Sequence, residues 1–199
     1  MTHIGWDDNM RPTVHMQTTM KIDRSKSVLL VIDMQPRFLT LVPDHETILR
    51  HCTWLMDLAG DTGVPVLLSA HYPGGMGAVS EVLTQNVPQA RVVEKLFFSC
   101  VEDGCLEGTA EAERKQWILC GIETHACVML TALDLVAAGK QVFLVVDAVA
   151  SRSPLDRETA LQRMAAAGVT LVTREMVFFE ILRKAGTPEF KACSRKYLR

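Results

Sequence analysis

The sequence has no apolar run close to the roughly 18 residues that a membrane-spanning helix requires, so we expect no membrane partner. It also lacks an excess of either charge, with a net charge of −2 across 199 residues. This balance gives no general attraction to nucleic acid and argues against a nucleic-acid partner. Hydrophobic residues make up 48% of the chain and charged residues 22%, which is typical of one globular domain with its own core.

Cysteine is scarce as well: six residues in a chain of this length are too few for a disulfide scaffold, and we expect reduced thiols. Cys100 and Cys105 are close enough in sequence to suggest a metal-binding pair, but no His or Cys follows at zinc-finger spacing. Residues 1–26 contain no apolar signal core, which argues against a targeting segment. We expect a loose N-terminal arm at 1–26, a domain at 27–199 and a cytoplasmic location, with a mitochondrial one left open.

Apolar segments of strand length alternate along the chain with segments of helical periodicity. Residues 27–32 (SVLLVI) form a continuous apolar run, which is typical of a strand buried on both faces. The next stretch repeats apolar residues at helical spacing from Ile48 to Ala59 and ends at Gly63. By the same patterns we predict further strands at 66–70, 91–94, 117–122, 141–146 and 170–172, helices at 127–138 and 154–167, a last helix at 175–184, and a glycine-rich loop at 71–78.

Strands that alternate with helices predict βαβ units with right-handed crossovers. The expected fold class is therefore α/β: a single domain of three α/β/α layers around a mainly parallel, Rossmann-like sheet. Active sites in such folds lie beyond the carboxyl ends of the strands. This rule selects Asp33 after the first strand, His71 after the second, Lys95 after the third and the turn at 121–127 after the fourth. We expect these residues to converge at one edge of the sheet.

Cys127 lies just past a buried strand and at the start of a predicted helix. Unpaired backbone N–H groups and the positive end of the helix dipole lower the pKa of a thiol at such a place, which favours a nucleophile. The position alone also fits a buried cysteine with no chemical role, which is the commoner case. Further residues must therefore decide between the two.

Asp33 and Lys95 are charged residues in apolar surroundings. Asp33 follows five apolar residues, where a buried carboxylate needs a partner and is placed to act as the base that takes a thiol proton. Lys95 precedes an apolar LFF segment, where its ammonium would hold Asp33 and favour a Cys127 thiolate. Each has an ordinary alternative, a capping or loop aspartate and a solvated lysine. Their expected convergence with Cys127 is what indicates a catalytic group.

Several segments of the chain resemble those of the isochorismatase-like cysteine hydrolases. In order and at that family's spacing they are VIDMQ at 31–35 with Phe38, VEK at 93–95 with Phe98 and Ser99, GIETHACV at 121–128, DAVASR at 147–152 and EMVFFE at 175–180. The loop YPGGMG at 72–77 is similar to that of a metal-free subgroup of uncharacterised isochorismatase domain proteins. The resemblance implies the same α/β fold that the strand and helix pattern predicts.

The resemblance further implies an Asp-Lys-Cys catalytic triad at Asp33, Lys95 and Cys127. It also implies a cis peptide between Ile122 and Glu123, and an oxyanion hole formed by the amides of Glu123 and Cys127. A triad of this kind would cleave an amide-type C–N bond of a small molecule through a thioester intermediate. Isochorismatases themselves cleave a vinyl ether and some lack the cysteine, so the triad does not fix the reaction.

The chain departs from metal-dependent members of this family. Nicotinamidases carry an Asp-x-His arrangement near the second strand, whereas this chain has SAHYP there, and no further histidine follows His71 until His125. We therefore expect no metal and no cofactor. We assign Phe38, His71, Tyr72 and Thr124 to the substrate pocket, although His71, which replaces the subgroup's usual Gln, also fits a loop histidine satisfied by backbone groups. We give His125 a structural or rim position, because residues two apart at a helix start do not face each other.

Two functions stay open at this point. The first is a small-molecule amidase or related C–N hydrolase, and the second is a binding protein of the same fold, including one associated with RNA. The intact triad favours the first, since a fold alone does not establish activity. A basic tail gives the second modest support; its residues are Lys191, Arg195, Lys196 and Arg199. Members of the family are commonly oligomers, so we also expect a homo-oligomer acting on a small-molecule substrate.

Overall fold

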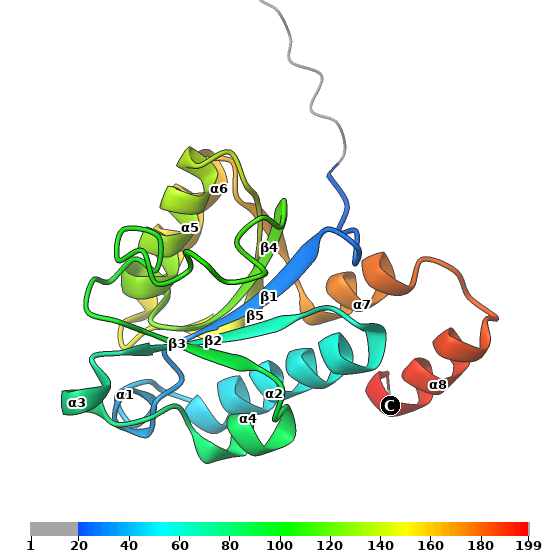
Figure 1. The fold of residues 1–199 in the computed structure, drawn as a ribbon, viewed down its shortest axis with the longest axis horizontal. Coiled ribbons are helices and arrows are strands. Elements are labelled where there is room, and N and C mark those ends of the chain that lie inside the picture. Colours follow the sequence, from blue (N-terminus) through cyan, green and yellow to red (C-terminus); the bar gives the residue numbers. More distant parts are fainter. Residues whose placement is uncertain (1–19, 199) are drawn as a thin grey trace, which may run out of the picture.

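The computed structural model describes residues 20–198. Within them, six parallel strands form one sheet in the order β3-β2-β1-β4-β5-β6 (Figure 1). The strands are β1 (Ser27–Ile32), β2 (Val66–His71), β3 (Arg91–Lys95), β4 (Gln116–Ile122), β5 (Gln141–Ala150) and β6 (Thr170–Val172). The predicted α/β fold with a parallel sheet is confirmed, and each predicted strand is present.

Helices cover both faces of this sheet. In Figure 1, α2, α4, α7 and α8 lie on one side of the strands, whereas α5 and α6 lie on the other. The helices are α1 (Pro36–Leu39), α2 (His45–Thr62), α3 (Pro73–Met76), α4 (Glu81–Asn86), the π-helical turn η1 (Thr124–Val128), α5 (Met129–Ala137), α6 (Pro154–Ala166), α7 (Arg174–Leu182) and α8 (Pro188–Tyr197). The result is the expected three-layer architecture.

The central strands β1 and β4 are buried along their whole length. Side chains alternate between the two faces of a strand, so a strand covered on both faces is apolar at every position. In β1, Leu29 and Val31 pack into the core beneath α2, whereas Val28, Leu30 and Ile32 pack into the core beneath α5 and α6. The apolar run in the sequence therefore reflects burial between two helical layers.

The strand order determines where a site can form. The chain runs outward from β1 to β2 and β3, then returns to place β4 on the other side of β1 and continues outward to β6. The loops that leave β1 and β4 therefore diverge, and such a switch point leaves a crevice at the carboxyl edge. Asp33 directly follows β1, and η1 with Cys127 follows β4. The topology thus brings these two distant parts of the chain together.

Four helices were not predicted from the sequence. α1, α3 and α4 have only four to six residues, which is too short for a helical period to emerge, and α3 lies in the segment expected to be a glycine-rich loop. α8 is longer and begins at Thr187, whose side chain accepts the N–H of Phe190. The expectation that the helix near Glu175 is the last one is therefore wrong. The basic residues Lys191, Arg195 and Lys196 lie exposed on α8, and Arg199 lies outside the described residues.

The part of the N-terminal arm that the structure describes is attached to the domain. Ile22 is fully buried, and its N–H donates to Glu180 Oε2 at 2.7 Å. The N–H of Asp23 donates to Gln116 Oε1 at 2.6 Å. The packed domain thus begins before residue 27, and the rest of the expected arm, 1–19, lies outside the described residues. None of the helices in 20–198 has the length and apolar character needed to cross a membrane.

Candidate active site

A cavity of about 120 Å³ opens at the carboxyl edge of the sheet, next to the switch point. It collects side chains from the ends of β1, β2 and β4 and from the loops after β3 and β5. The lining residues are Asp33, Phe38, His71, Phe98, Ile122, Glu123, Ala126, Cys127 and Arg152. Most of the wall is apolar, so the charged and nucleophilic groups lie in a largely apolar environment. The convergence expected from the edge rule is present.

Asp33 and Lys95 form a buried ion pair. Lys95 Nζ donates to Asp33 Oδ2 at 2.7 Å, and the side chains of Lys95 and Asp33 are 0% and 2% exposed. Ser69 Oγ donates to the other carboxylate oxygen at 2.6 Å. Asp33 itself has a φ of 52°, a left-handed conformation that costs a non-glycine residue on the order of 1–3 kcal/mol. The neighbouring strands β1, β2 and β3 thus hold the carboxylate in one fixed position.

The charge on Lys95 depends on this pairing. Burial disfavours an ammonium, but the Asp33 carboxylate and the nearby Cys127 outweigh that penalty, and the pKa of Lys95 is raised. Lys95 is therefore charged at neutral pH. It places a fixed positive charge beside any negative charge that develops at Cys127.

Cys127 lies in η1, between β4 and α5, and is 7% exposed. Its Sγ, a carboxylate oxygen of Asp33 and a ring nitrogen of His71 all lie within 4.8 Å of one another. The helix predicted at 127–138 starts earlier than expected, at Thr124, and its first turn is π-helical. Such widened turns are common at functional sites. Here the turn places the Cys127 thiol just beyond the carboxyl end of β4, next to Asp33.

The protonation state of Cys127 differs from the expected one. Burial raises the pKa of its thiol, the Asp33 carboxylate raises it further, and Lys95 opposes both. The prediction that the helix start lowers the pKa of this thiol is therefore wrong. The sulfur lies inside the protein, where desolvation destabilises a thiolate by more than the helix N-terminus stabilises it. The resting site thus pairs a neutral thiol with a carboxylate. A carboxylate oxygen of Asp33 lies within 4.8 Å of the Cys127 sulfur.

This protonation state predicts an unusual pH profile for alkylation of Cys127. Below its pKa, the thiolate fraction grows about tenfold with each pH unit, whereas an ordinary thiol levels off above a pKa of about 8.5. We expect iodoacetamide to alkylate Cys127 slowly at neutral pH. In the folded protein the rate of alkylation should still increase with pH above the value at which the rate for the same cysteine becomes constant in the urea-unfolded chain. Mass spectrometry of peptide 116–140 follows both rates. A plateau near neutral pH in the folded protein would show a lowered pKa instead.

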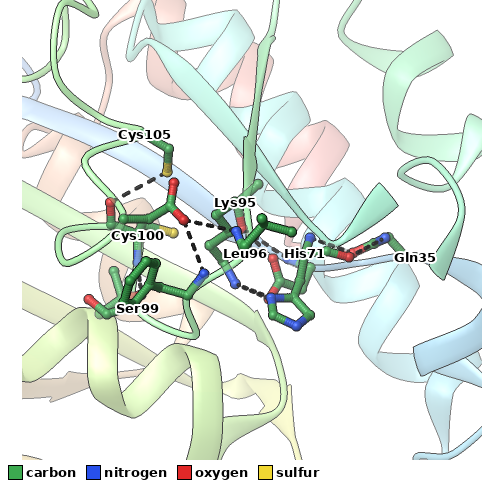
Figure 2. Close-up of polar contacts among 12 residues, drawn as sticks. Gln35, His71, Lys95, Leu96, Ser99, Cys100 and Cys105 are labelled. Atoms are coloured by element: carbon green, nitrogen blue, oxygen red, sulfur yellow. Dashed lines mark hydrogen bonds and ion pairs between the residues drawn. The ribbon is translucent and has the colours of Figure 1, made fainter. Parts of the chain in front are cut away.

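His71 joins the ion pair to the cavity wall. Its Nδ1 lies 3.4 Å from Lys95 Nζ (Figure 2). Its ring stacks on Phe98 with centroids 5.2 Å apart and lies 6.0 Å from Phe38. Burial, followed by the positive charge of Lys95, lowers the pKa of His71, so the imidazole is neutral at pH 7 and can accept a hydrogen bond from the ammonium. The position of His71 is thus built into the site and is not that of an ordinary loop histidine.

Gln35 is a site residue that sequence reasoning missed. Its side-chain oxygen accepts the backbone N–H of His71 at 2.8 Å, and its amide nitrogen donates to the carbonyls of His71 and Gly77 at 3.0 and 2.6 Å. Figure 2 shows this side chain reaching across to the end of β2. Gln35 therefore fixes the backbone of His71. The sequence signal for it is its place in the VIDMQ segment at 31–35, which contributes to the family resemblance.

The acidic residue Glu123 is buried at the opposite side of the cavity. Arg152 Nε lies 2.8 Å from Glu123 Oε1, and His125 Nδ1 lies 3.5 Å from Glu123 Oε2. His125 also lies 3.0 Å from Ser151 Oγ, so it interacts with the 151–152 loop, as a structural or rim residue would. Arg152 and Phe98 line the cavity but were not proposed as pocket residues. Arg152 ends the DAVASR segment, which is the one signal that points to it.

Two residues assigned to the pocket lie elsewhere in the structure. Tyr72 is 52% exposed and is not part of the described cavity lining. Thr124 is the first residue of η1 and is fully buried, and among the described residues its Oγ1 has no hydrogen-bond partner. Phe38 and His71 do line the cavity. The peptide bond between Ile122 and Glu123, which the resemblance implied to be cis, is cis.

Asp33, His71 and Cys127 also offer donor atoms close enough to hold a metal ion together. Aspartate, histidine and cysteine are all ligands of zinc. However, the Lys95 ammonium lies 2.7 Å from the Asp33 carboxylate and would repel a divalent cation there. The residues present therefore fit an ion pair better than a metal centre.

Three solved structures share the fold of this chain across nearly the whole molecule. MAR1 ribonuclease from Caenorhabditis elegans has a TM-score of 0.84 and 31% identity, with 90% of this chain and 93% of that chain covered. YcaC from Pseudomonas aeruginosa, with hexane-2,5-diol and covalent acrylamide, has a TM-score of 0.83 and 26% identity, with 91% and 93% covered. YcaC from Escherichia coli, an octameric hydrolase of unknown specificity, has a TM-score of 0.81 and 25% identity, with 89% and 91% covered.

Sequence comparison leads to the same group of proteins. Isochorismatase domain-containing protein 2A of Mus musculus is 38% identical over 166 residues, which are 83% of this chain and 79% of that protein. The isochorismatase domain itself matches residues 27–176, from the first strand to the start of α7. Together with the six-stranded parallel sheet, this match shows that the chain belongs to the isochorismatase family, whose members are generally hydrolases.

Proposed function

We propose that this chain is a cysteine hydrolase that cleaves an amide-type C–N bond of a small molecule. One observation carries the proposal: the Asp33 carboxylate, held by a buried ion pair with Lys95, lies within 4.8 Å of the Cys127 sulfur, and Asp33 and Cys127 line the same cavity. Burying two charges is costly, and breaking such a pair is more costly still. A pair kept next to a thiol at the carboxyl edge of the sheet is best explained by catalysis.

In the proposed first half-reaction, Asp33 takes the proton from Cys127 Sγ as the sulfur attacks the substrate carbonyl carbon. The charge of Lys95 favours the thiolate that forms. The amides of Glu123 and Cys127 would donate to the developing oxyanion, and one such donor is typically worth ~10²–10³ in rate. The C–N bond then breaks, Asp33 returns its proton to the leaving nitrogen, and the acyl group stays on sulfur as a thioester.

In the second half-reaction, Asp33 is again a carboxylate and removes a proton from water. The water oxygen attacks the thioester carbonyl, the C–S bond breaks, and the sulfur regains a proton. Asp33 thus serves twice as base and twice as acid, and it returns to its starting state. This cycle agrees with a resting site in which the Cys127 thiol is neutral, because the base that activates it lies beside it.

The cavity favours a small, uncharged substrate. Its volume of about 120 Å³ is well below the roughly 300–1,000 Å³ of pockets for drug-sized ligands. The two cations that the described structure places at the site, Lys95 and Arg152, each pair with a carboxylate, so neither is available for a substrate acid group. Phe38 and Phe98 offer flat apolar walls.

The comparisons support this proposal in two respects. A structural relative holds covalent acrylamide, an amide-bearing electrophile of a size suited to this cavity. Another relative is an octameric hydrolase, which supports a homo-oligomer for this chain as well. The RNA-associated alternative is supported by a neighbour's name, MAR1 ribonuclease, and by the exposed basic residues of α8. A cavity of about 120 Å³ is too small to hold a nucleic-acid strand, so we favour the small-molecule hydrolase.

The test is a screen of small uncharged amides, carbamates and ureas with the purified full-length chain. Release of ammonia or amine is measured, and intact mass spectrometry of quenched reactions looks for the acyl adduct. We expect turnover of at least one class and an adduct on peptide 116–140, both lost in Cys127→Ala. The matched control is Cys193→Ala, a buried cysteine in α8 remote from the cavity, which keeps full activity. Turnover that persists in Cys127→Ala would refute the cysteine mechanism.

A further inference from the structure

A second pair of thiols lies on the segment that follows Lys95. Cys100 is fully buried, and its N–H donates to Thr131 Oγ1 at 3.0 Å, which ties it to α5. Gly104 has a φ of 77°, and the chain turns back there so that Cys105 lies over Cys100. Cys105 Sγ donates to the Cys100 carbonyl at 3.4 Å (Figure 2). A turn with only four residues between the two cysteines therefore holds their side chains close together.

The two thiols differ in exposure and in acidity. Cys105 is partly exposed, whereas Cys100 is shut off from solvent. The Cys100 thiol hydrogen-bonds to the Cys105 sulfur and lowers the pKa of Cys105, against the effect of burial and of Asp103. The same bond, together with burial, raises the pKa of Cys100. Cys105 is thus the accessible and more reactive sulfur, and Cys100 is the protonated partner behind it.

We propose that Cys105 and Cys100 form a dithiol site that hydroperoxides oxidise to an intramolecular disulfide. The Cys105 sulfur attacks a peroxide oxygen and the O–O bond breaks; water or an alcohol leaves, and Cys105 becomes a sulfenic acid. The Cys100 sulfur then attacks the Cys105 sulfur, the S–S bond forms, and the sulfenic oxygen leaves as water with the Cys100 proton. The two thiols give up two electrons, which the hydroperoxide accepts.

The position of this pair connects it to the active site. Asp103 lies inside the ring that the disulfide would close, and its carboxylate accepts the N–H groups of Leu96 and Phe97 at 2.8 and 3.0 Å. These residues link Lys95 to Phe98, which lines the cavity and stacks on His71. Closing the ring therefore reshapes the turn that anchors one wall of the cavity. We expect the bridged protein to react more slowly at Cys127.

The chain supplies its own control pair. Cys52 in α2 lies close enough to Cys120 in β4 to contribute, after burial, to the raised pKa of the Cys120 thiol, but both residues are completely buried. If proximity of two thiols were enough for a disulfide to form, both pairs would be oxidised. If the hydroperoxide must also reach one of the sulfurs, only Cys100 and Cys105 would be oxidised. No Lys or Arg lies between Cys100 and Cys105, so trypsin leaves them in one peptide, 96–114, and a bridge appears there as the loss of two hydrogens.

The experiment treats the full-length protein with hydrogen peroxide, blocks free thiols with N-ethylmaleimide after unfolding, and maps the peptides by mass spectrometry. We expect peptide 96–114 to become bridged roughly tenfold or more faster than Cys52 and Cys120 lose free thiol. Cys105→Ser abolishes the bridge, and Cys193→Ser leaves it unchanged. A dithiol peptide that survives peroxide, or Cys105 that gains oxygen without bridging, would overturn the proposal.

A second measurement tests the connection to the cavity. After peroxide is removed, iodoacetamide labelling of Cys127 is timed in the bridged and the dithiothreitol-reduced protein. Slower labelling that dithiothreitol restores supports the connection, and equal rates overturn it. Neither readout requires turnover, so a failure of the proposed hydrolase activity leaves this result distinct.

Discussion

The variant Asp33→Asn is expected to reduce turnover by on the order of 10⁴-fold, as loss of a triad carboxylate does in other hydrolases. It is also expected to lower the free energy of unfolding by about 3–5 kcal/mol, because Lys95 then keeps its charge in the interior without a partner. Asn is nearly the same size as Asp and tolerates a left-handed backbone, so the φ of 52° is not a separate source of loss. Urea unfolding and the amide assay measure the two effects.

A double variant separates the two roles of the pair. Lys95→Met removes the buried cation and on its own leaves the Asp33 carboxylate unpaired, so it is also destabilising. In Asp33→Asn with Lys95→Met no buried charge remains, and we expect the double variant to be more stable than either single variant. Its activity stays lost. Equal stabilities for the single and double variants would mean that the two charges do not depend on each other.

A surface pair provides the matched control. Lys196 Nζ lies 2.9 Å from Asp61 Oδ2, but the side chains of Lys196 and Asp61 are 51% and 43% exposed. Because water screens such a pair, Lys196→Met is expected to change the free energy of unfolding by no more than about 1 kcal/mol. The unfolding free energies of all these variants can be compared at neutral pH, where Lys95 is charged. The folded-state pKa of Lys95 is raised, so its charge contributes stability below the ordinary lysine pKa of about 10.4 and loses it only in alkali.

The general location of the site could be predicted because it depends on features that a sequence shows directly. Strands buried between two helical layers must be apolar throughout, so their ends are visible where the apolar runs stop. Asp33 and Lys95 stand at such ends, and parallel strands bring their carboxyl ends to one edge. The juxtaposition of Asp33, Lys95 and Cys127 followed from that rule and from the family resemblance together.

The finer features of the site depend on contacts between segments that no local pattern records. Gln35 matters because its amide reaches the backbone of His71, and Phe98 matters because it stacks on the His71 ring. The direction of the Cys127 pKa shift was predicted wrongly for the same reason. A helix start is visible in the sequence, but the desolvation that outweighs it comes from residues distant along the chain. Tyr72, which we assigned to the pocket, does not line the described cavity: it directly precedes α3, its backbone is left-handed with φ 43°, and its side chain is exposed.

Gly121 illustrates how a close backbone contact can decide whether the site forms at all. It pairs with Ile32 across β4 and β1, one residue before Asp33 and at the switch point itself. Its φ is 112°, and a Cβ added there would meet the Ile32 carbonyl oxygen at 2.1 Å and the Ile32 nitrogen at 2.6 Å. Both atoms are backbone in a central strand, so no side-chain rotation relieves the overlap. The sequence showed this glycine as part of a motif but not the contact that requires it.

Gly121→Ala is therefore expected to lower the free energy of unfolding by about 3–5 kcal/mol, from backbone strain and overpacking together. Gly139→Ala is the matched control: its φ of 76° carries similar strain, but a Cβ there meets no atom within 4 Å. The control should cost only about 1–2 kcal/mol. Urea unfolding of both variants measures the difference, and limited proteolysis replaces it if Gly121→Ala does not fold stably.

Because β1 must move away from β4 to admit the methyl group, the folded fraction of Gly121→Ala should also lose the alignment of Asp33 with Cys127. Equal stability in the two variants would contradict the close contact between the strands.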